Sequence, residues 1–111
     1  MLSFSGSLKV FVAVEPCDMR NGFNGLHALV TERLGEDPRG GALFVFTNRR
    51  RNRVKILWWD GSGLLVCAKR LERGKFTIPV SENGQVSLRG EEFNALIHGL
   101  EVRLKKNWYR R

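Results

Sequence analysis

Three apolar runs in the middle of the chain, separated by short turn signals, restrict the fold most strongly. "ALFVFT" (42–47), "RVKILWWD" (53–60) and "GLLVCAKR" (63–70) each have the length of a strand and are rich in β-branched and aromatic residues. "NRRRN" separates the first pair, and Asp60–Gly61–Ser62–Gly63 is a strong turn signal between the second pair. The pattern predicts a meander of three antiparallel strands.

The alternation of side chains in this meander predicts its register. If Thr47 pairs with Arg53, one face of the meander is almost wholly apolar and includes Trp58. A slip of one residue would bury Lys55 against Phe46, so the first register is preferred. The other face then carries Arg53, Lys55, Trp59 and Arg70.

Further strands and two helices flank the meander. Period-two apolar residues over 8–14 predict a strand, and helical spacing predicts helices over 22–34 and 90–100. Asp18 or Asn21 is the expected N-cap of the first helix. Short strands are expected at 75–80, at a sheet edge because Pro79 has no N–H, and at 85–88.

These elements predict an α+β fold. It consists of a small, mainly antiparallel sheet with both helices packed on its apolar face. The expected domain organisation is a single domain over residues 1–104, followed by a basic aromatic tail at 105–111.

Positive charge is concentrated in the second part of the chain. Residues 1–48 carry four Lys or Arg and five Asp or Glu, whereas residues 49–111 carry fifteen and six. The net charges of −1 and +9 predict a basic surface that binds a polyanion, most often nucleic acid. The alternative is a solvated basic surface without a partner.

The basic hairpin and the segment after the meander supply the predicted contact residues. Consecutive arginines repel each other, and ordinary turns favour Gly, Asn or Asp, so the hairpin favours contact with phosphates over a simple solvated turn. Trp59 is expected to stack a base, to hold an Arg by cation–π contact or to dock a protein, or else to be buried under the second helix. The predicted nucleic-acid-binding residues are Arg49, Arg50, Arg51, Arg53, Lys55, Trp59, Lys69, Arg70 and Arg73.

The sequence gives little indication of catalysis, a metal or a cofactor. Cys17 and Cys67 are fifty positions apart, without the spacing of a zinc site or a disulfide scaffold. Asp18, Asp60 and Glu72 are a conceivable acidic metal cluster, but helix capping explains Asp18 and the turn explains Asp60. We expect no enzyme activity, no cofactor, no metal and no membrane segment, and a cytosolic location.

Two stretches carry a specific resemblance to a known family. "DMRNGFNGL" (18–26) and "LFVFTNRRRNRVKILWWDGSGLLVCAKRLERGKF" (43–76) resemble the small accessory protein, often labelled TnpB, of the insertion sequence sixty-six family. The resemblance extends over residues 8–104. The matching positions are Asp18, Met19, Arg20, Gly22, Phe23, Gly25, Phe44, Arg53, Lys55, Leu57, Trp58, Trp59, Asp60, Gly63, Lys69, Arg70, Leu71, Glu72 and Gly74.

The resemblance implies a protein encoded beside a larger transposase and needed for transposition of the element. Together with the charge, it leads us to expect a non-enzymatic accessory factor whose partners are DNA and the transposase of the same element. The rival hypothesis is an adaptor protein that binds an acidic region of the transposase and makes no direct contact with DNA. Both hypotheses use the same basic surface.

Overall fold

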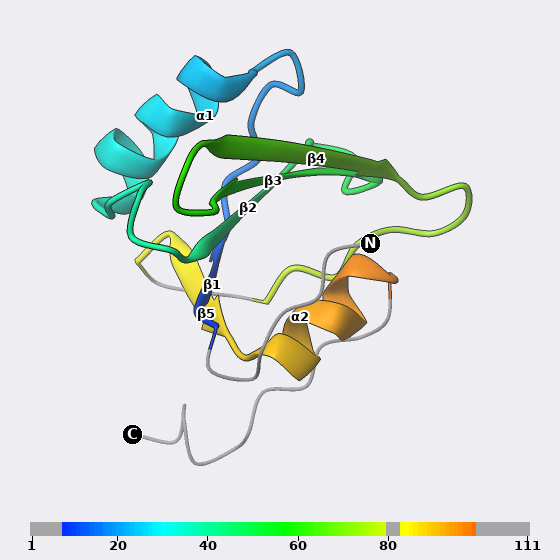
Figure 1. Cartoon of the computed structure of the whole chain (residues 1–111). Coiled ribbons are helices and arrows are strands. Elements are labelled where there is room, and N and C mark those ends of the chain that lie inside the picture. The colour runs from blue at the N-terminus through cyan, green and yellow to red at the C-terminus, as the bar shows by residue number, and fades with distance from the viewer. Residues whose placement is uncertain (1–7, 80–82, 100–111) are drawn as a thin grey trace.

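A five-stranded sheet forms the centre of the computed structural model, which describes residues 8–79 and 83–99 (Figure 1). Its strands lie in the order β4-β3-β2-β1-β5, with β1 parallel to β2 and the other neighbours antiparallel. This confirms the predicted α+β class. The strands are β1 (Val10–Ala13), β2 (Leu43–Thr47), β3 (Arg53–Trp59), β4 (Leu64–Arg70) and β5 (Gln85–Leu88).

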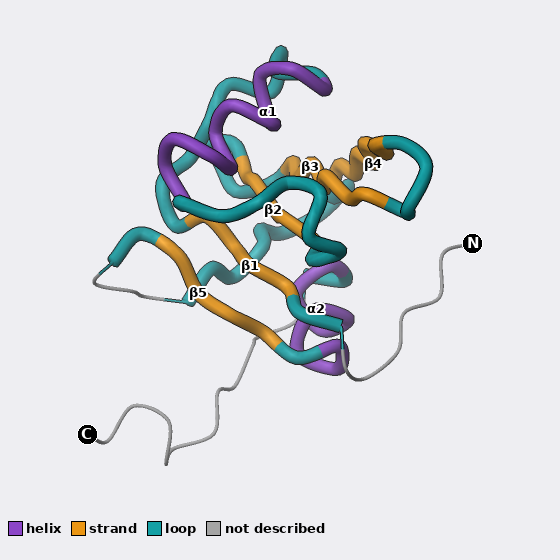
Figure 2. The backbone as a smooth tube through the Cα atoms, turned by 60° about the vertical axis from the view of Figure 1, so that its left-hand side comes forward, coloured by secondary structure: helices purple, strands orange, loops and turns teal. Residues whose placement is uncertain are grey.

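The two helical segments cover opposite faces of the sheet (Figure 2). The first, α1 (Phe23–Leu29), continues into a turn of π-helix, η1 (Val30–Leu34), and the second is α2 (Gly90–Ile97). The prediction of both helices on one apolar face was wrong. All five residues of β2 are buried, so the centre of the sheet has two apolar faces, and each needs a cover.

The register of the β2–β3 hairpin differs by one residue from the prediction. Thr47 pairs with Val54, and Phe46 therefore lies opposite Lys55. Asn48 closes the loop, since its Oδ1 accepts hydrogen bonds from the backbone N–H groups of Asn52 and Arg53. The position of Lys55 opposite Phe46 does not leave its charge without a partner, because its ammonium group reaches past the apolar residues to a backbone carbonyl.

The distribution of side chains between the faces of β3 agrees with the prediction despite the slip. Arg53, Lys55 and Trp59 share the α1 face, and Arg70 lies opposite Arg53 on β4. Trp58 points to the α2 face and packs against its core. These relationships depend only on alternation within β3 and on the second hairpin, which the Asp60–Gly63 turn fixes as expected.

Two local predictions were not met, and a third is not tested. Residues 75–79 form no strand, because the N–H of Phe76 donates to the carbonyl of Arg51 and its ring is buried in the core. The residue before α1 is Gly22, and no side chain caps this helix. The predicted tail at 105–111 lies outside the described residues, as does residue 100 at the end of the second predicted helix.

Candidate nucleic-acid interface

Two adjoining hollows at one end of the sheet bring together basic residues from three segments of the chain. The larger, of about 460 Å³, lies between the 17–20 loop and the β2–β3 hairpin. The smaller, of about 200 Å³, lies over the ends of β3 and β4, and the two share Met19 and Arg53. The basic residues that line them are Arg20, Arg49, Arg50, Arg53, Lys55, Lys69 and Arg70.

The 17–20 loop forms a tight turn that is tied to the sheet. The carbonyl of Asp18 accepts from the N–H of Asn21 at 3.1 Å and from its side-chain amide at 2.9 Å. The N–H of Cys17 donates to the carbonyl of Thr47 at 2.8 Å, next to the start of the hairpin. Gly25 gives the Asn21 side chain room, since a Cβ there would lie 2.1 Å from Oδ1 of Asn21. The loop therefore has a defined position beside the hairpin.

The three consecutive arginines of the hairpin do not point the same way. Arg49 and Arg50 are exposed, and both line the larger hollow. Arg51 is half-buried, has a left-handed backbone with φ of 61°, and donates from Nη2 to the carbonyl of Val14 at 2.8 Å and from Nη1 to Oγ1 of Thr47. Burial lowers the pKa of its guanidinium. Arg51 thus ties the hairpin to the end of β1.

Lys55 also makes an internal contact. Its Nζ donates to the carbonyl of Asn21 at 2.8 Å, which fastens the turn after Asp18 to β3. Its partly buried ammonium still lines the smaller hollow and contributes its charge there.

The remaining predicted cations lie at the end of β4 and just beyond it. Arg70 is exposed beside Arg53 and forms a 3.4 Å ion pair with Glu72 that is open to solvent. Lys69 borders the smaller hollow, although its side chain alternates to the other face of β4. Arg73 is exposed in the following loop, which the Phe76–Arg51 hydrogen bond holds against the hairpin.

Trp59 lies at the opposite end of β3 from the hairpin. Six residues separate it from Arg53, which places it roughly 20 Å away along an extended strand. Its half-buried ring contacts the guanidinium of Arg39, with 5.0 Å between Cζ and the ring centroid. The structure therefore does not bring Trp59 together with the other predicted contact residues.

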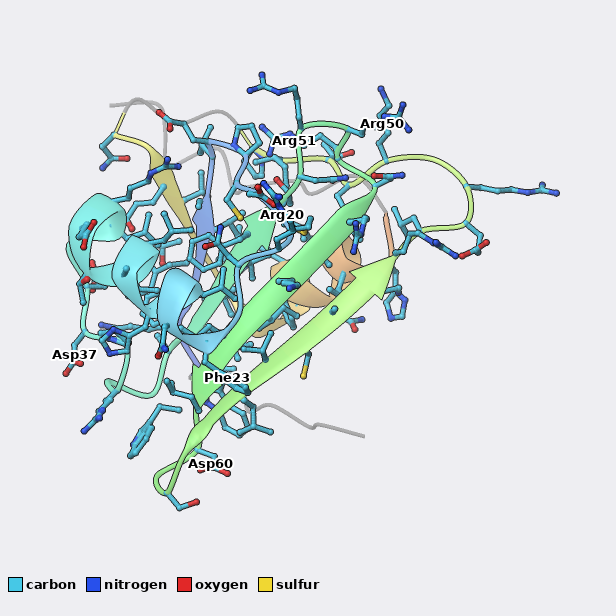
Figure 3. The ribbon with its side chains drawn as sticks, turned by 90° about the horizontal axis from the view of Figure 1, so that it is seen from above. Arg20, Phe23, Asp37, Arg50, Arg51 and Asp60 are labelled. Atoms are coloured by element: carbon cyan, nitrogen blue, oxygen red, sulfur yellow. The ribbon has the colours of Figure 1, made fainter. Side chains whose placement is uncertain are left out.

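The three carboxylates of the conceivable metal cluster, Asp18, Asp60 and Glu72, have separate positions and partners. Asp18 binds Arg20, Glu72 binds Arg70, and Asp60 accepts from Ser62 and Gly63 in its turn. These turn hydrogen bonds lower the pKa of Asp60. Figure 3 shows Asp60 at one end of the sheet and Arg20, Arg50 and Arg51 at the other. Within residues 8–79 and 83–99, no three His, Cys, Asp or Glu residues are grouped as metal ligands would be.

The larger hollow contains residues that the sequence-based site omitted. Arg20 is among the residues of the family resemblance, but it is distant in sequence from the hairpin, so charge clustering did not select it. Cys17 is half-buried in the same wall, and burial is the main cause that raises the pKa of its thiol. The sequence feature that points to this side of the hollow is the motif "DMR" at 18–20. Its place beside the hairpin depends on tertiary contacts, which the sequence does not reveal.

The helices of the described part of the chain are too short and polar to cross a membrane.

No solved structure matches the chain significantly. Two proteins of Sinorhizobium fredii (strain NBRC 101917 / NGR234) are similar to it. Uncharacterized protein y4jC is 42% identical over 107 residues, covering 96% of this chain and 92% of the relative. Uncharacterized protein y4hO is 34% identical over 110 residues, covering 99% and 96%.

The comparison with protein families gives a match over nearly the whole chain. Residues 8–107 match the family described as IS66 Orf2 like protein. The match includes both walls of the larger hollow and the whole meander. The chain therefore belongs to the IS66 Orf2-like family, which has an accessory role in the transposition of its insertion sequence.

Proposed function

We propose that this protein serves transposition by binding nucleic acid, with DNA as the expected ligand, through the two basic hollows. The phosphate backbone contacts the exposed arginines of the hairpin and of the β4 end. The proposed contact residues are Arg49, Arg50, Arg53, Lys69, Arg70 and Arg73. The partly buried Lys55 adds its positive charge to the smaller hollow.

The observation that carries this proposal is the convergence of cations from separate segments around adjoining concave surfaces. Arg53 lines both hollows, so one arginine borders two places where an anion can bind. Among the residues that the structure describes, Asp18 is the only acidic one that lines either of them. Guanidinium groups bind phosphate oxygens through two parallel hydrogen bonds, and each contact displaces condensed counterions from the duplex.

Electrostatics at this end also favours a nucleic acid over a small anion. Exposed cations extend from Arg20 across Arg53 to Arg70, so a ligand with repeated charges can engage several at once. A single phosphate would occupy only one hollow. A polyanion gains from every additional contact, because counterion release adds with each neutralised phosphate.

The test is a titration of the purified protein with a fluorescently labelled DNA duplex across a salt series. One duplex carries the end of the insertion sequence and a second has an unrelated sequence. We expect log affinity to fall linearly with log salt, by about 0.9 for each phosphate contact on duplex DNA. Binding that does not change with salt, or no binding to either duplex at low salt, would refute the proposal.

A further inference from the structure

We infer that Arg20 is a phosphate-binding residue of this surface and that Asp18 is its positioning residue. The inference deepens the proposed function and rests on it. It assigns a role in binding to the carboxylate of Asp18, which lies in a basic hollow where a negative charge would otherwise weaken the attraction for a phosphate.

The contacts between the two residues are numerous and directional. Oδ1 of Asp18 accepts from the backbone N–H of Arg20 at 2.8 Å and from its Nε at 3.1 Å. Oδ2 accepts from Nε at 3.0 Å and from Nη2 at 2.7 Å. The carboxylate therefore holds both the backbone and one edge of the guanidinium, which fixes the plane of the group.

This arrangement leaves the opposite side of the guanidinium available. A guanidinium has five N–H donors, and the carboxylate uses those of Nε and one of Nη2. Nη1 has no hydrogen-bond partner among residues 8–79 and 83–99. Of the three remaining donors, one on Nη1 and one on Nη2 point the same way and form the end-on fork that binds phosphate oxygens in pairs. The Arg20 side chain is 91% exposed, so an incoming phosphate can reach this fork.

The turn that carries the pair is itself fixed. Lys55 holds the carbonyl of Asn21, and Thr47 holds the N–H of Cys17, on either side of Asp18 and Arg20. A binding group that is already oriented loses less conformational entropy when it contacts its ligand. Arg20 is thus prepared for a phosphate in the larger hollow before that phosphate arrives.

The inference predicts an effect whose sign differs from that of simple charge attraction. Changing Asp18 to Asn makes the protein more positive, which by attraction alone would strengthen DNA binding. If Asp18 acts by orienting Arg20, the same change weakens binding, by about three- to tenfold for one disordered charge-assisted contact. Arg20→Ala should weaken it by about tenfold and reduce the salt slope by about 0.9.

A double-mutant cycle separates the two explanations. Affinity for the unrelated DNA duplex is measured for the wild type, Asp18→Asn, Arg20→Ala and the double variant, with thermal unfolding confirming that each is folded. Asp18→Asn should weaken binding only when Arg20 is present, and should leave affinity equal or higher in the Arg20→Ala background.

Each outcome of this cycle is decisive. Stronger binding by Asp18→Asn in the wild-type background would overturn the positioning role, and so would an equal loss in both backgrounds. An unchanged salt slope in Arg20→Ala would remove Arg20 from the contact surface. Failure of the proposed function looks different, since the wild type itself would then show no salt-dependent binding.

Discussion

The guanidinium of Arg51 donates a hydrogen bond from Nη2 to the backbone carbonyl of Val14, 2.8 Å away and at the end of a different strand. The contact joins the β2–β3 hairpin to the segment that leads into the Asp18 turn. Of the three consecutive arginines, Arg49 and Arg50 face solvent and Arg51 holds the loop in place. This division of roles leads to the first prediction.

Arg51→Ala should lower the free energy of unfolding by about 1–3 kcal/mol, because it leaves the buried hydroxyl of Thr47 and the Val14 carbonyl without their donor. Arg51→Gly should lose less, since glycine adopts the left-handed backbone without the penalty of about 1–2 kcal/mol. Urea unfolding followed by tryptophan fluorescence measures both. The matched control Arg50→Ala should stay within about 0.5 kcal/mol of the wild type; equal losses at the two positions would contradict the structural role.

Removal of three exposed cations from the hairpin should weaken DNA binding far more than removal of three elsewhere. The test variant changes Arg49, Arg50 and Arg53 to Ala, and the salt slope should fall by about 0.9 for each lost contact. The control variant changes Lys9, Arg33 and Arg39 to Ala, which are exposed but line neither basic hollow. Both lower the formal charge of +8 by three, so equal effects would show that only net charge matters.

Trp59→Ala should leave the affinity and the salt slope for DNA unchanged, because the ring lies at the far end of β3 and contacts Arg39. The variant should lose some stability, of which the cation–π contact accounts for about 0.5–1 kcal/mol. Duplex titration and thermal unfolding give the two readouts. A clear loss of DNA affinity in a folded Trp59→Ala protein would support the stacking role that the sequence suggested.

Gly25→Ala should destabilise the protein, although alanine is the better helix former by about 1 kcal/mol. The new Cβ would lie 2.1 Å from Oδ1 of Asn21, and that side chain is held by its hydrogen bond to Asp18. Thermal unfolding of Gly25→Ala, Asn21→Ala and the double variant tests this. Because the double variant lacks the obstructing side chain, its loss of stability should be smaller than the sum of the losses in the two single variants. Gly22→Ala is the matched control, because nothing lies within 4 Å of its Cβ.

The carboxyl of Asp18 should titrate at an unusually low pH. The hydrogen bonds from Arg20 lower the pKa of Asp18 to about 2, and the ion pair is therefore present above the usual titration range of an aspartate and is lost as the pH falls through the folded pKa. A side-chain carboxyl NMR titration checks this. In Arg20→Ala the pKa should return part of the way toward the ordinary value of about 3.9, because the backbone N–H of residue 20 still donates to the carboxylate; a pKa that does not rise would show that the guanidinium is not the cause.

Much of the candidate site follows from local sequence signals. The meander, its second turn and the presence of Arg53, Lys55 and Arg70 on one face follow from apolar runs and side-chain alternation. The hairpin register did not follow, because it depends on how Asn48 closes the loop and on a backbone conformation at Arg51 that sequence propensity does not select. The assumption of a single apolar face led to the wrong register, whereas β2 is covered on both sides.

The sequence by itself determined the class of fold, the concentration of positive charge and the family, since composition, periodicity and motif are local properties of the chain. Only the tertiary structure decided which charges act together. It turned Arg51 toward Val14, left Trp59 at the far end of β3, and brought Arg20 beside Arg53. The physical reason is that a long cationic side chain takes its direction from the acceptors within reach, and those acceptors come from segments distant in sequence.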